Sequence, residues 1–126
     1  MNYIFHHVHV TCKDLEKMIS FFTDILKGQL VARKEFSGAK GAKISFNGVH
    51  VNISVPHNDN PVEHPDSDTG IHHLAFQVEN CDLSYDSIKS AGYRFTKPPK
   101  TYGNTRTAFF NGPEDVAVEI IQLDPI

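Results

Sequence analysis

The sequence predicts an α+β domain built from two similar βαβββ modules. In each half, a period-2 run of apolar residues and histidines comes first, an amphipathic helical segment follows it, and three more strand-like runs complete the half. The chain of 126 residues has the length of one domain, and half of it is too short to be stable alone. We therefore expect a single domain over 1–126, with module 1 at about 1–56, a linker at 57–70 and module 2 at about 71–126.

The first half contains each expected element in turn. Residues 4–12 alternate between apolar and polar side chains and predict a strand, and Asp14 offers an oxygen that can cap a helix. Apolar residues then recur at three- and four-residue steps over 15–26, and Gly28 suits a left-handed helix stop. Strands are predicted at 30–36, 42–46 and 49–55, with Asn47 and Gly48 as a tight hairpin turn.

The second half repeats this order after the proline-rich linker. A strand is predicted at 71–79, Asp82 is expected to cap a shorter helix, and Gly92 is expected to end it. Three strands follow at 94–97, 105–110 and 116–122, with a turn at 111–114 between the last two. Cys12 and Cys81 follow the first strand of each half and are expected to be buried thiols, because neither has CxxC spacing.

A histidine and then an amide or carboxylate recur at matching points of the two halves. Asn52 follows His7 by 45 residues (52 − 7 = 45), and Glu119 follows His73 by 46 residues (119 − 73 = 46). If the halves fold alike and close on one another, the four side chains converge, and two imidazoles with a carboxylate suit a first-row metal. His50 shares the strand face of Asn52 and is the alternative ligand, because imidazole is the better donor for a transition metal.

Two further residues are candidates for the substrate site. His9 shares the strand face of His7 and is expected either to line the cavity or to pack in the interior. Arg106 lies on a predicted strand and is expected either to clamp a carboxylate or phosphate of the substrate or to be an ordinary surface arginine.

The composition points to a small-molecule partner. The formal net charge is −3 with acidic and basic residues intermixed, so nucleic acid and anionic membranes are unfavoured partners. No stretch of about 18 apolar residues and no signal-peptide pattern is present, so we expect a cytoplasmic protein.

Three segments carry a resemblance to a known family: HHVHVTCKDLEKMISFFTDILKG, GIHHLAFQVENCD and TRTAFFNGPEDVAVEIIQ. They resemble the vicinal oxygen chelate superfamily of glyoxalase, bleomycin-resistance and extradiol dioxygenase proteins, and look most like its methylmalonyl-CoA epimerase and glyoxalase I branches. The resemblance implies a half-open curved barrel around a cleft, a homodimer, and one divalent metal ion: Zn, Ni, Co, Mn or Fe. His7, Asn52, His73 and Glu119 match the ligand positions of the family.

From this resemblance we expect a metal-dependent lyase or isomerase that acts on a small bidentate oxygenated substrate through an enolate or enediolate, with Glu119 as the base. Two features differ from those enzymes: Asn52 is shorter than the Glu or Gln found there, and 38–43 lacks the glutamate of the epimerases. If Asn52 does not bind, the other three ligands form a triad that suits an Fe(II) extradiol-type dioxygenase. The second alternative is a metal-free, drug-binding protein of the bleomycin-resistance kind.

Overall fold

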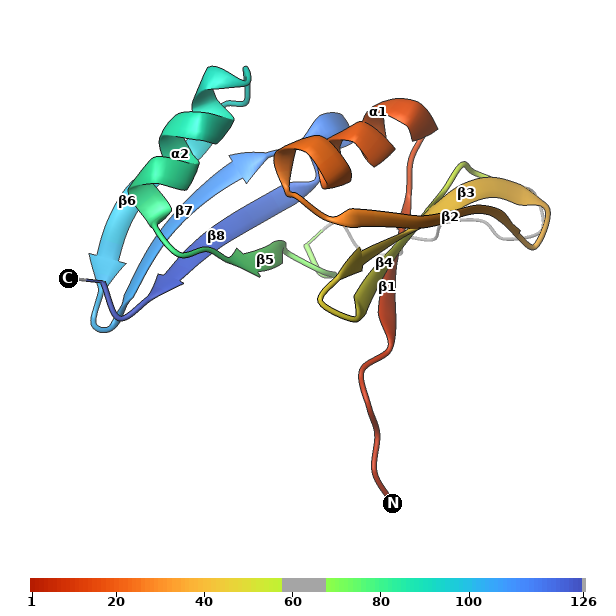
Figure 1. Cartoon of the computed structure of the whole chain (residues 1–126), viewed down its shortest axis with the longest axis horizontal. Helices are drawn as coiled ribbons and strands as arrows, with labels where there is room; N and C mark the ends of the chain where they lie inside the picture. The colour runs from red at the N-terminus through yellow and green to blue at the C-terminus, as the bar shows by residue number, and fades with distance from the viewer. Residues whose placement is uncertain (58–67, 126) are drawn as a thin grey trace. The chain divides into compact units, whose positions relative to one another are not determined.

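The computed structural model describes residues 1–57 and 68–125, which belong to two compact units, Met1–Pro65 and Asp66–Ile126 (Figure 1). Each unit holds one four-stranded mixed sheet with a helical segment between its first and second strands. This arrangement confirms the predicted fold class, α+β with two βαβββ modules. The predicted linker at 57–70 falls largely on residues 58–67, which lie outside the described residues.

The first unit contains β1 (His7–Thr11), α1 (Leu15–Ser20), the π-helical turn η1 (Phe21–Ile25), β2 (Gln29–Phe36), β3 (Ala39–Phe46) and β4 (Val49–Ser54). Its strand order is β1-β4-β3-β2, with β1 parallel to β4 and the other pairs antiparallel. Asp14 caps α1 as predicted, because its side chain accepts a hydrogen bond from the Lys17 N–H at 3.0 Å. Asn47 and Gly48 have φ values of 51° and 90°, which confirms the tight hairpin turn.

The helical segment of this unit ends differently from the prediction. Lys27 adopts the left-handed conformation with φ 65°, so the expected left-handed stop at Gly28 is wrong. Gly28 is required for space instead, because a Cβ there would lie 2.6 Å from side-chain atoms of Ile44 and Phe46. A glycine serves close packing as well as positive φ, and the sequence alone does not distinguish the two uses.

The second unit contains β5 (Leu74–Gln77), α2 (Cys81–Ser90), β6 (Phe95–Tyr102), β7 (Thr105–Asn111), the 3₁₀ turn η2 (Pro113–Asp115) and β8 (Ala117–Leu123). Its strand order, β5-β8-β7-β6, repeats that of the first unit. The expected cap at Asp82 is wrong: Asn80 caps α2 by accepting a hydrogen bond from the Leu83 N–H at 3.0 Å. Gly92 has φ 101° after the last helical turn, as predicted.

The helical segment of each unit packs on one face of its own sheet, and Figure 1 shows α2 lying along its sheet. The buried residues of the first unit include Met18, Phe21, Phe22, Ile44 and Ile53, and those of the second include Cys81, Ile88, Phe110, Val118 and Ile120. Burying each of these larger side chains contributes roughly 1.5–3 kcal/mol. Because side chains alternate along a strand, the opposite face of each sheet, named the polar face, carries Asn52 in the first unit and Glu119 in the second.

The two cysteines belong to these cores. Cys12 is 2% exposed and Cys81 is 0% exposed, and neither forms a disulfide bond, which confirms the predicted buried thiols. Burial, and then the charge of Asp82, raise the pKa of the Cys81 thiol. The described helices are all too short and too polar to cross a membrane.

Candidate metal and substrate site

His73 and Glu119 are in direct contact on the polar face of the second sheet. Glu119 of β8 pairs with Ala75 of β5, and His73 lies two residues before Ala75, so its side chain falls on the face of Glu119. Nε2 of His73 lies 3.1 Å from Oε1 of Glu119, where the carboxylate accepts a hydrogen bond. The two side chains are 29% and 15% exposed. The contact thus brings together an imidazole and a carboxylate, and both groups are donors that first-row metals accept.

Two neighbours fix the orientation of the His73 ring. Nδ1 of His72 lies 2.9 Å from Nδ1 of His73, so one nitrogen donates a hydrogen bond to the other. The Phe109 ring packs edge-on against His73, with 5.1 Å between the ring centroids. These contacts leave Nε2 of His73 directed to Glu119, an arrangement typical of a ligating histidine whose other nitrogen is hydrogen-bonded.

The first unit places His7 and Asn52 in the same relation. His9 pairs with Asn52 across β1 and β4, and His7 lies two residues before His9. Nδ1 of His6 lies 2.8 Å from Nδ1 of His7, so this histidine pair also repeats. The near-repeat of the sequence is thus a repeat in strand register, with His7 equivalent to His73 and Asn52 to Glu119. His50, the alternative ligand, pairs with His7 rather than with His9.

Asn52 carries an unsatisfied polar atom. The residue is 5% exposed, and its Oδ1 is the buried side-chain polar atom that finds no hydrogen-bond partner within 1–57 and 68–125. Leaving a buried amide oxygen without a donor costs roughly 1–3 kcal/mol. A cation is an alternative partner for such an oxygen, so the first unit fits the fourth-ligand prediction for Asn52.

His9 lies beside this position on the same strand face. Its Nε2 lies 2.7 Å from Oγ of Ser54, and its ring packs edge-on against Phe36 at a centroid distance of 4.9 Å. Burial, and then the charge of His7, lower the pKa of His9. These contacts favour a neutral imidazole that is fixed in place on the polar face.

Each unit supplies two of the four predicted ligands. Within 1–57 and 68–125, no group of three or more His, Cys, Asp or Glu side chains lies close enough together to hold a metal ion. The repeat gives each unit one pair of donors, His7 with Asn52 and His73 with Glu119.

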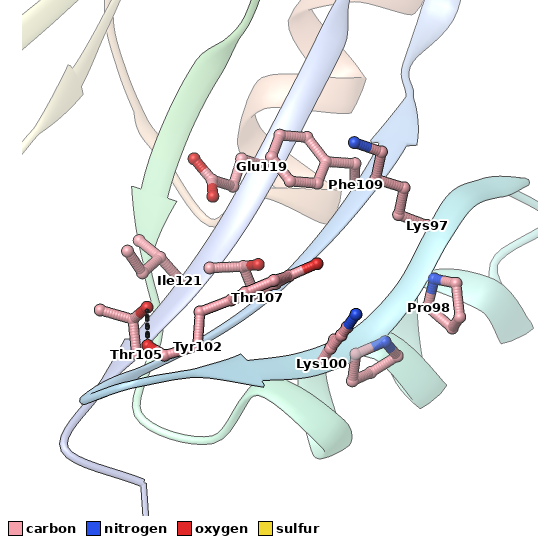
Figure 2. Close-up of a pocket in the computed structure, with 10 residues that line it drawn as sticks. Lys97, Pro98, Lys100, Tyr102, Thr105, Thr107, Phe109, Glu119 and Ile121 are labelled. Carbon is pink, nitrogen blue, oxygen red and sulfur yellow. Dashed lines mark hydrogen bonds between the residues drawn. The ribbon is translucent and has the colours of Figure 1, made fainter.

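A cavity of about 580 Å³ opens on the polar face of the second sheet, with walls from β6, β7 and β8. Glu119, Phe109, Thr107 and Ile121 line it on the sheet, and residues 97–100 line it along the edge strand (Figure 2). The sequence prediction missed Lys97 and Lys100 as lining residues. The strand was predicted to end at Lys97, before two prolines, whereas β6 continues to Tyr102.

Arg106, the predicted substrate clamp, has another partner in the structure. Thr105 and Thr107 line the cavity, so the intervening Arg106 side chain points to the opposite face of the sheet. There its Nε and Nη2 each donate to a carboxylate oxygen of Asp82 at 2.9 Å, and Nη1 donates to Thr101. The guanidinium lowers the pKa of Asp82. A substrate contact by Arg106 stays a prediction, and the structure places its charge on the helix side.

The two equivalent sheets, with histidine on the first strand and an oxygen donor on the last strand of each, define a protein of the vicinal oxygen chelate class. The chain belongs to the Glyoxalase/Bleomycin resistance protein/Dioxygenase superfamily, whose family model matches residues 4–120.

Similar proteins in this superfamily carry different descriptions. A probable lactoylglutathione lyase of Synechocystis sp. is 28% identical over 125 residues, which is 92% of each chain. The fosfomycin resistance protein FosX of Listeria monocytogenes, solved with Mn(II) and sulfate, is 17% identical with a TM-score of 0.71 over 97% of this chain and 93% of its own. The antibiotic-binding protein TnmS3 of Streptomyces sp. is 17% identical with a TM-score of 0.73 over 98% of this chain and 97% of its own. At this identity, the two solved structures support the fold alone.

Proposed function

We propose that this chain is a divalent-metal-dependent lyase or isomerase for a small substrate with two neighbouring oxygens. The observation that carries the proposal is the unsatisfied, buried Oδ1 of Asn52, at the position equivalent to Glu119. In the second unit, His73 and Glu119 are hydrogen-bonded to each other. In the first unit, Oδ1 of Asn52 has no hydrogen-bond donor among the described residues. His7, Asn52, His73 and Glu119 would hold the ion, with the two modules taken from one chain or from a homodimer.

The ion, when bound, supplies Lewis-acid polarisation of the substrate oxygens. Glu119 is the proposed base, and this role is supported because its carboxylate lines the cavity and only one of its oxygens contacts His73. It takes a proton from the carbon beside the substrate carbonyl and returns it to the same or the neighbouring carbon. Phe109 and Ile121 line the cavity around this carboxylate and supply its apolar surface.

The lyase-named relative identifies the first substrate to test. The purified protein is analysed for metal, stripped with a chelator and reloaded with Zn, Ni, Co, Mn or Fe(II) in turn. The turnover of lactoylglutathione is then measured for each form, with Glu119→Gln as the variant that retains side-chain volume but loses the base. Metal-dependent turnover that disappears in Glu119→Gln supports the proposal. Binding of no ion by the reloaded wild type contradicts it.

The Fe(II) extradiol-type dioxygenase is the second candidate, because His7, His73 and Glu119 alone form a two-histidine, one-carboxylate set. Oxygen uptake by the Fe(II)-loaded protein with catechol would favour this reaction over the isomerase. A metal-free drug-binding role instead predicts ligand binding that chelation leaves unchanged, and the similar structure TnmS3 is an antibiotic-binding protein.

A further inference from the structure

The edge strand β6 contains an extra residue at its two prolines. Lys97 pairs with Phe109 and Lys100 pairs with Thr107, so three steps along β6 match two steps along β7. Residues three apart on a regular strand point to opposite faces, but a bulge of one residue returns them to the same face. Pro98 and Pro99 suit this position, because proline lacks an N–H and is tolerated at bulges and edges. Both lysines consequently lie on the cavity face of the sheet.

This bulge is specific to the second module. The edge strand β2 of the first unit has one register shift, between Leu30 and Ala32, which corresponds to the shift between Phe95 and Lys97 in β6. The strand β2 has no second shift, and the residues at the register positions of Lys97 and Lys100 are Ala32 and Lys34. The bulge at the two prolines is therefore an addition to the repeated fold, and it keeps Lys97 and Lys100 on one face of the sheet, where Lys97 adds a second cation.

The two ammonium groups are not neutralised by the described part of the protein. Nζ of Lys97 lies 5.3 Å from the centroid of the Phe109 ring, and Nζ of Lys100 lies 5.0 Å from that of Tyr102. Within residues 1–57 and 68–125, neither ammonium forms an ion pair with a carboxylate. Glu119 is the acidic residue of the cavity, and Figure 2 shows the Phe109 ring between its carboxylate and Lys97.

The cavity thus has three parts with different chemistry: a carboxylate beside His73, an apolar floor of Phe109 and Ile121, and two ammonium groups at the edge strand. We propose that Lys97 and Lys100 bind a negatively charged oxygen group, a carboxylate or a phosphate, of a substrate whose apolar middle covers Phe109. An ammonium group forms a stronger hydrogen bond to a charged carboxylate or phosphate than to a neutral oxygen acceptor. The assignment of the reacting end to Glu119 rests on the proposed function, whereas the anion site does not.

The test uses three probes that share one apolar chain: hexanoate, hexyl phosphate and the neutral hexanamide. Each is titrated into the metal-free, full-length protein, and dissociation constants are taken from backbone amide shifts over residues 95–111. We expect at least one anionic probe to bind about fivefold to tenfold more tightly than hexanamide. The tighter of hexanoate and hexyl phosphate identifies the group as a carboxylate or a phosphate. Equal affinities for all three probes, or no detectable binding of any of them, would overturn the anion site.

Lysine variants test whether Lys97 and Lys100 cause the preference for anionic probes. Lys97→Met and Lys100→Met should each reduce the preference for the anionic probe, and the double variant should remove it. Lys89→Met is the matched control, because Lys89 also has its Nζ over an aromatic ring, Tyr85 at 5.4 Å, but lies on α2. An undiminished preference in the double variant would contradict the proposal.

Metal titration of the same proteins separates the two proposals. The lysine double variant should bind metal with the affinity of wild type, because neither lysine is a ligand. If wild type binds no metal but retains the lysine-dependent anion preference, the proposed function fails and the anion site remains. If metal binds and the preference is absent, the anion site fails and the proposed function remains.

Discussion

His73 and Glu119 join the first and last strands of the second module through a 3.1 Å contact between Nε2 and Oε1. His7 and Asn52 have the same register in the first module, but the Asn52 oxygen has no hydrogen-bond partner in the described ranges. The two modules therefore have these residues at equivalent positions, but the carboxylate of Glu119 corresponds to the amide of Asn52. His73 and Glu119 are hydrogen-bonded to each other, whereas the buried amide leaves an acceptor available, and a metal ion is a suitable partner for it.

Replacing either His73 or Glu119 should weaken metal binding strongly. Glu119→Ala and His73→Ala each remove one ligand, and we expect a loss of affinity of at least about a hundredfold, since even outer-shell partners cost roughly 10–100-fold. Competition with a chromophoric chelator measures this affinity. Asp86→Asn is the control, because Asp86 lies on α2. Stoichiometric metal retained by both Ala variants would remove these residues from the ligand set.

Asn52 distinguishes a four-ligand site from a three-ligand site. If its Oδ1 binds the ion, Asn52→Ala should lower metal affinity while Asn52→Gln and Asn52→Glu retain it, because the longer acceptors still reach. With His7, His73 and Glu119 as the full set, Asn52→Ala should keep the affinity of wild type. Chelator competition on the three variants decides between these results, and unchanged affinity in Asn52→Ala favours the dioxygenase type of site.

The same residue should limit the stability of the metal-free protein. Because a buried amide oxygen without a partner costs roughly 1–3 kcal/mol, Asn52→Leu should raise the free energy of unfolding by about 1 kcal/mol in the presence of a chelator. Added metal should stabilise wild type by about 2.7 kcal/mol at one hundred times its dissociation constant, and should stabilise Asn52→Leu less. Denaturant titrations with and without metal test both statements. A strongly destabilised Asn52→Leu in chelator would show that the amide is satisfied.

His72 should act by positioning His73. Its Nδ1 lies 2.9 Å from Nδ1 of His73, and a neutral imidazole can either donate or accept there depending on its tautomer. His72→Phe removes both options, so metal affinity should fall by about tenfold without loss of the ion itself. His6→Phe tests the equivalent contact to His7 in the first module. If both variants bind metal as wild type does, the histidine pairs are surface contacts without a role in the site.

Most of the fold could be predicted from the sequence because the hydrophobic periodicities are strong and recur in both halves. The order of strands and helices, the Asp14 cap and the Asn47-Gly48 turn all follow from local chemistry, and the structure confirms them. The register between strands is set by non-local pairing, yet the spacing of His7 to Asn52 and His73 to Glu119 anticipated it.

The sequence was insufficient where one residue type serves two purposes. Gly28 provides space rather than a positive φ, and Asp82 lies two residues too late to cap α2, where Asn80 takes that role. The lysines of the cavity were missed for a related reason. Two prolines normally end a strand, but on the edge strand β6 they form a bulge, and only the pairing with β7 reveals which face Lys100 occupies.

The Arg106–Asp82 ion pair should give the protein a pH-dependent stability that is separate from its function. The hydrogen bonds from Arg106 lower the pKa of Asp82, and partial burial opposes this effect. The stabilisation is therefore fully present above the ordinary pKa of an aspartate, and it is lost as the pH falls through the lowered pKa of the folded state. Asp82→Asn should flatten this part of the stability profile relative to wild type, while Asp86→Asn on the same helix should leave it unchanged.

The same pair decides whether Arg106 contacts the substrate. Because its guanidinium lies on the helix face, Arg106→Gln should lower stability above the pKa of Asp82 and leave the probe preference of the cavity intact. Urea titrations across acidic to neutral pH give the stability, and the hexanoate and hexanamide titrations give the preference. A loss of anion preference in Arg106→Gln at unchanged stability would instead support the predicted clamp, since the arginine would then have to leave Asp82 when the ligand binds.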